Sequence, residues 1–181
     1  MRLLTQLIGR RTVRTLVVLA SAFAAFAAGG AAPAGATTAT TFTLTAEALS
    51  ISAPIGSVSL GSQVAATNAS TISGPLGTVT VLDQRGGTTT WTATVISTAF
   101  TPPAGPADPA SNVSYASGAI TASANVTPTA VAASDLTGVS SVVTGASTGI
   151  SSASWNPVIS VIVPPNYAPG VYLATITHSV A

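Results

Sequence analysis

The sequence predicts an all-β protein, one antiparallel β-sandwich behind an N-terminal export segment. The first reason is composition. Residues 37–181 include 16 Val, 9 Ile and 25 Thr but no Lys or Met; β-branched residues fit a pleated sheet, whereas the missing residues favour helices. The second reason is that short segments alternate apolar and hydroxylated residues with period two, and no apolar stripe of helical period accompanies them.

Residues 1–36 have the three parts of a secretory signal peptide. An arginine-rich start precedes an apolar run over residues 16–28, and Ala34-Gly35-Ala36 closes the segment. The run is shorter than the roughly 20 residues that a membrane-spanning helix needs. We therefore expect cleavage after Ala36, in preference to a retained anchor. The pair Arg10-Arg11 also resembles a twin-arginine export signal, so the export route stays open.

Residues 37–41 read as a short polar tether, and the predicted sandwich domain occupies residues 42–181. In its first half, strands are predicted at residues 41–46, 58–60, 76–82 and 91–95. Phe42 and Leu44 alternate with threonines in the first of these strands, as Trp91 and Val95 do in the fourth. Each segment therefore has one apolar face to bury.

The second half of the domain begins with a proline-rich stretch, Thr101 to Pro109, which cannot donate to a sheet ladder and is expected to be an exposed loop within one domain. Weaker strand candidates surround residues 113–115, 120, 126 and 142, and stronger ones cover 158–163 and 171–180. Eight or nine short strands of this kind predict an Ig-like sandwich of the Greek-key type. The inward-facing positions predict a core of Phe42, Leu44, Val79, Val81, Trp91, Val95, Ile159, Val161, Tyr172 and Ile176.

The charge distribution excludes several classes of function. Four of the five basic residues lie in the first fourteen positions, and beyond them Arg85 stands against four carboxylates, a formal charge of −3. One arginine cannot neutralise the phosphates of a nucleic acid or hold a polybasic contact with a membrane. Cysteine is absent, which excludes disulfides and thiolate chemistry. We expect no cofactor and no metal site, because His178 has no second ligand at a suitable spacing.

The segment Leu76 to Gly87, followed by Trp91-Thr92-Ala93, resembles the first motif of the WxL-type cell-wall-binding domains of Gram-positive bacteria. In that family a strand, an Asp-x-Arg-Gly turn and a Trp-x-Leu strand follow one another. The run from Val158 to Pro164 and the ending from Ala168 to Val180 look like those of secreted actinobacterial relatives. Two features depart from the family pattern: Ala93 replaces the leucine, and the second Trp-x-Leu is missing. The resemblance implies noncovalent attachment to peptidoglycan.

Four residues are candidate wall-binding residues: Trp155, Trp91, Asp83 and Arg85. Trp91 can alternatively anchor the core between two sheets. Trp155 lies beside Asn156-Pro157 at a strand entrance, where a partly exposed binding residue and a buried structural residue are both open. Asp83 and Arg85 flank the Gly86-Gly87 turn, so a local ion pair that holds a hairpin is the alternative to a binding site.

The sequence predicts an exported, noncatalytic protein of the cell surface, with a wall polymer or other surface proteins as its partner. It predicts no enzyme: His178 with Asp135 and a serine is the only possible triad, and no nucleophile-elbow motif accompanies it. A structural or adhesin-like subunit is the alternative, in which the amphipathic run of residues 42–51 completes a neighbour's sandwich by strand exchange.

Overall fold

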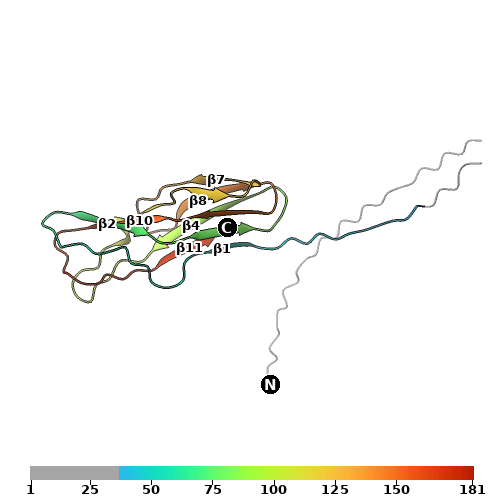
Figure 1. Cartoon of the computed structure of the whole chain (residues 1–181). Coiled ribbons are helices and arrows are strands. Elements are labelled where there is room, and N and C mark those ends of the chain that lie inside the picture. Colours follow the sequence, from blue (N-terminus) through green and yellow to red (C-terminus); the bar gives the residue numbers. More distant parts are fainter. Residues whose placement is uncertain (1–36) are drawn as a thin grey trace, which may run out of the picture. The chain divides into compact units, whose positions relative to one another are not determined.

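The computed structural model describes residues 37–181, so the predicted signal peptide at residues 1–36 lies outside the described residues. The described residues form antiparallel strands and one short 3-10 turn, Ala110–Asn112 (Figure 1). The predicted all-β class and antiparallel pairing are thus confirmed. All the strands belong to one compact unit, Thr43–Ala181. No helix among the described residues has the length and apolar character that a membrane span requires.

The strands form three sheets. The first sheet has the order β1 (Leu49–Ser52), β3 (Val79–Asp83), β9 (Ser151–Trp155) and β6 (Ile120–Ala122). The second has β2 (Ser70–Pro75), β10 (Val158–Val163) and β5 (Val113–Ala116), and the third has β11 (Ile176–Val180), β4 (Thr89–Ser97), β8 (Ser140–Ser147) and β7 (Val126–Ala130). Consecutive strands often change sheet, so side chains from distant parts of the sequence share one interior.

The core contains most of the predicted inward-facing residues. Six of them are buried: Val79, Val81, Trp91, Val95, Ile159 and Val161. Ile176 is half-buried and packs against the same core. Along β4, burial alternates from Trp91 to Ser97, as a strand with one covered face requires. The predicted inward face of this strand is therefore confirmed.

The predicted strand at residues 41–46 is wrong, and so is the placement of Phe42 and Leu44 in the core. These two side chains are 91% and 89% exposed, and the first strand is β1, a few residues later. The register explains the difference: Leu49 pairs with Asp83, the last residue of β3. Glu47 still donates its backbone N–H to the carbonyl of Gln84 at 3.0 Å, but residues 41–46 extend beyond the end of the strand that could pair with them.

The predicted short strand at residues 58–60 is also wrong, because this part of the chain belongs to an irregular segment between β1 and β2. The segment passes close over β2. A Cβ atom added to Gly74 would lie 3.0 Å from the Cα atom of Leu60, so only glycine permits this approach without displacement. The dipeptide Gly74-Pro75 completes β2.

The final predicted strand, residues 171–180, is regular only in β11. Before β11, Leu173 makes an isolated bridge to Thr101. Exposure alternates through the whole run, but Tyr172 is half-buried at the surface, so its placement in the core is wrong. Strand β9 was not predicted, since its Ser-rich sequence has few large apolar residues to mark a period. The described residues hold eleven strands in place of eight or nine.

Candidate functional site

Asp83 and Arg85 form a local ion pair. The Arg85 Nε donates to Asp83 Oδ1 at 2.9 Å and its Nη2 donates to Oδ2 at 3.0 Å. Arg85 Nη2 also donates to the carbonyl of Thr90 at 2.9 Å, and the Thr89 hydroxyl donates to Asp83 Oδ2 at 2.7 Å. The Asp83 side chain is only 1% exposed, and both of its carboxylate oxygens accept hydrogen bonds from groups of the same turn.

This ion pair holds a corner between two sheets and not a hairpin, because β3 and β4 belong to different sheets. Gly86 and Gly87 form the corner with φ angles of 70° and 69°, which glycine adopts without strain. The hydrogen bond from the Arg85 side chain is the main reason that the pKa of Asp83 lies well below its ordinary value. The carboxylate is therefore ionised whenever the domain is folded near neutral pH.

Trp91 lies in the core, with 2% of its surface exposed. Its indole ring lies against the backbone of Gly145 on the neighbouring strand β8, and the two residues are paired in register. Among the described side chains, its Nε1 is a buried polar atom without a hydrogen-bond partner. Burial of this kind fits the expectation of a core anchor.

Trp155 is also 2% exposed, so the alternative of a partly exposed tryptophan is wrong. Its Nε1 donates to the hydroxyl of Tyr115 at 2.7 Å, and that hydroxyl lies 3.3 Å from Nε2 of His178. The rings of Tyr115 and His178 meet edge to face, with centroids 5.7 Å apart. The next residue, Asn156, accepts a hydrogen bond from the Gly77 backbone at 3.0 Å, which fixes the passage to β10.

The four candidate wall-binding residues therefore do not form one site. Val79 pairs with Trp155 and Asp83 pairs with Ser151, which places Asp83 and Trp155 at opposite ends of the β3–β9 ladder. Trp91 lies in another sheet. Both indole rings are covered, and a polymer outside the domain cannot touch them without local opening.

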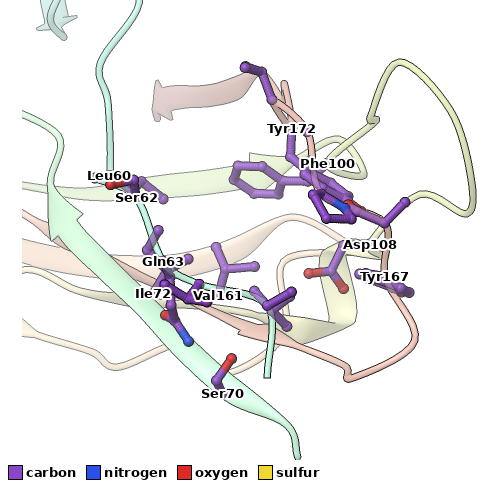
Figure 2. Close-up of a pocket in the computed structure, with 18 of the residues that line it drawn as sticks. Leu60, Ser62, Gln63, Ser70, Ile72, Phe100, Asp108, Val161, Tyr167 and Tyr172 are labelled. Atoms are coloured by element: carbon purple, nitrogen blue, oxygen red, sulfur yellow. The ribbon is translucent and has the colours of Figure 1, made fainter. Parts of the chain in front are cut away.

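The domain has a cavity with a volume of about 590 Å³. The irregular segment of residues 57–66 forms one wall, and strands β2 and β10 and residues 164–173 form the others. Figure 2 shows Leu60, Gln63 and Ile72 on one side of it, facing Phe100 and Tyr172. Its size and its largely apolar lining are typical of small-molecule sites.

Asp108 supplies a carboxylate to this cavity, although its side chain is only 2% exposed. The residue is held in place because its backbone exchanges two hydrogen bonds of 2.8 Å with Phe100. Asn112 donates to its Oδ1 at 2.6 Å. Burial raises the pKa of Asp108 above its ordinary value, although hydrogen bonds from Asn112 and Tyr167 act in the opposite direction.

Two tyrosines line the cavity beside this carboxylate. The rings of Tyr167 and Tyr172 are stacked, with centroids 6.1 Å apart and an angle of 16° between their planes. Their hydroxyls donate to nearby carbonyls, Tyr167 to Ala107 at 3.2 Å and Tyr172 to Ala168 at 2.9 Å. A smaller cavity of about 180 Å³ shares Phe100 and Tyr172.

Sequence reasoning missed this cavity. Asp108 was visible as the one carboxylate in the proline-rich stretch, and Phe100 and Tyr172 as aromatic residues at segment ends. Residues 57–66, however, have no periodic pattern that predicts where they lie. Within the described part of the chain, no group of three or more His, Asp or Glu side chains could hold a metal ion.

Comparisons of the chain with the models of known protein families, with curated proteins and with solved structures find no match in any of the three.

Proposed function

We propose that this chain is an exported, noncatalytic protein of the bacterial cell surface that attaches noncovalently to the cell wall, to peptidoglycan or an associated polymer. The observation that carries the proposal is the cavity of about 590 Å³, with an apolar and aromatic lining and one carboxylate. Pockets of roughly 300 to 1,000 Å³ with few polar groups hold most small ligands of proteins. A side group or terminal unit of a wall polymer matches this size.

Two features of the sequence support the location. The segment of residues 1–36 has the pattern of a secretory signal peptide, and residues 76–91 resemble the first WxL motif of Gram-positive wall-binding domains. An Ig-like sandwich of the Greek-key type belongs to the same proposal, since sandwiches of this kind are common among cell-surface domains.

The described surface favours contact through hydroxyl groups and rings. Threonines and serines are abundant, and Arg85, the one Lys or Arg among residues 37–181, is paired with Asp83. Hydrogen bonds and apolar contact then supply most of the affinity. Such binding depends weakly on ionic strength, whereas exposed ion pairs weaken as salt is added.

The test is retention of the purified mature protein on insoluble peptidoglycan across a salt series. Two variants make a matched pair: Val64→Arg alters an 86% exposed valine that lines the cavity, and Val139→Arg alters a 71% exposed valine outside it. We expect wild type and Val139→Arg to be retained at every salt concentration, and Val64→Arg to be released. Equal retention of all three would exclude the cavity, and no retention of wild type would exclude wall attachment.

A strand-exchanging surface subunit is the second candidate. It is favoured by Phe42 and Leu44, apolar side chains that alternate with threonines outside any strand and are 91% and 89% exposed. Such a segment can add a strand to a neighbour's sheet. Multimers that resist dissociation on a gel and disappear in Leu44→Asp, together with no wall binding, would favour this candidate over the first.

A further inference from the structure

Asp108 is an acidic group in an unusual setting. The carboxylate is 2% exposed, yet it lines an open apolar cavity, and Figure 2 shows it pointing inward near Val161 and Tyr167. Its bond from Asn112, at 2.6 Å, comes from a neutral amide. A buried carboxylate held only by neutral groups keeps an uncompensated negative charge, which is costly in an apolar environment.

The described chain has no cation available to compensate this charge. Arg85 is the one Lys or Arg in residues 37–181, and it is bonded to Asp83. No basic side chain lines the cavity of Asp108, while His178 lines the smaller one and lies beside Tyr115. Since no Lys, Arg or His lines this cavity, a cation that pairs with Asp108 has to come from a ligand.

The rest of the lining suits the remainder of such a ligand. Phe100, Tyr167 and Tyr172 provide aromatic surfaces, and a cation near an aromatic face gains further attraction. Leu60 and Ile72 provide apolar contact on the opposite wall. An anionic ligand would be repelled by Asp108, and a neutral hydroxyl would leave the charge in place.

We infer that this cavity binds a ligand with an ammonium group on an apolar chain, and that the ammonium pairs with Asp108. The inference rests on the proposed function for the source of the ligand: wall peptides that carry free amino groups. One ion pair in a recessed site is screened much less than pairs on the surface, so the weak salt dependence expected above still holds.

The direct test uses n-hexylammonium as the probe and n-hexanol as a neutral control of similar shape. Binding to the mature protein is measured by chemical-shift titration. Asp108→Asn removes the charge in the cavity, and Glu47→Gln removes a charge from an exposed residue outside it. We expect hexylammonium to bind wild type and Glu47→Gln equally, and Asp108→Asn at least about tenfold more weakly, because the variant loses a hydrogen bond between two charged groups.

If Asp108→Asn does not fold, the ammonium site is still tested by comparing the affinities of wild type for hexylammonium and for hexanol. Equal affinity for hexanol and hexylammonium, or an unchanged affinity in a folded Asp108→Asn, would overturn the inference. A second arm uses purified walls whose amino groups have been acetylated, on which wild type should be retained less than on untreated walls.

The two arms separate the inference from the proposed function. Retention on both kinds of wall without binding of hexylammonium leaves wall attachment standing and overturns the ammonium site. Binding of hexylammonium that depends on Asp108, without retention on any wall, supports the ammonium site and overturns wall attachment.

Discussion

The contact between Trp91 and Gly145 makes a sharp test of the core. A Cβ atom at position 145 would overlap Cε2 and Cζ2 of the indole and lie 2.6 Å from its Nε1. Real Cβ atoms do not approach other heavy atoms this closely, so Gly145→Ala must displace the ring or bend β8. Overpacking of this kind costs about 1 to 3 kcal/mol of unfolding free energy.

The sign of the effect should reverse when the indole is removed. Trp91→Ala alone should cost about 3 to 5 kcal/mol, because it deletes a large buried ring. In that background the space beside position 145 is open, and Gly145→Ala should stabilise the strand by about 0.5 to 1 kcal/mol, since glycine is unfavourable within a strand. The two effects give a coupling energy of about 1.5 to 4 kcal/mol.

The assay is equilibrium unfolding in urea for wild type, both single variants and the double variant. Trp155 is present in all four proteins and reports the transition by fluorescence. If Gly145→Ala destabilises both backgrounds equally, its cost does not come from the indole, and the packing described here is wrong.

Titratable groups supply further predictions, all measured as unfolding free energy against pH. Asp83 has a lowered pKa when folded, so its contribution to stability is full above the ordinary value of 3.8 and is lost as the pH falls below it. Arg85→Ala should weaken this dependence, since it removes the largest cause of the lowered pKa, and should cost about 1 to 3 kcal/mol at neutral pH. Burial lowers the pKa of His178, so stability should fall as the pH decreases below 6.5, and a flat profile there would contradict its burial. Burial raises the pKa of Tyr115 to about 12, so stability should fall as the pH rises from 10 toward 12, and Tyr115→Phe should abolish that loss. Burial also raises the pKa of Asp108, so folding is less favourable once the pH exceeds 3.8, and Asp108→Asn should be at least as stable as wild type at neutral pH.

The sequence predicted those parts of the fold where a strand is covered on one face. Val79, Val81, Trp91 and Val95 alternate with polar residues, and burial follows the same alternation. The pattern works because a shift by one residue would bury threonines and expose the apolar side chains. Local periodicity therefore determines which face of such a strand is buried, without knowledge of the partner strand.

The same pattern failed for Phe42 and Leu44, because alternation shows that a segment can pair but not that a partner is within reach. The sequence left the exposure of Trp155 open, because its hydrogen-bond partner Tyr115 lies 40 residues away in the chain. The cavity of Asp108 could not be predicted at all, since one wall is an irregular segment without periodicity. Of the four residues proposed as a site, the sequence correctly suggested a local ion pair for Asp83 and Arg85.

The hydrogen-bonded group of Trp155, Tyr115 and His178 has a consequence for the order in which the domain folds. Its members come from β9, β5 and β11, one from each of the three sheets, and β11 is the last strand in chain order. Until residues 176–180 have been made, β4 keeps an open edge and the Tyr115 hydroxyl lacks its contact with the imidazole. The interior of the domain therefore cannot close until its last strand is in place. A chain halted at residue 174 should be cut readily by protease, and one extended through β11 should resist it.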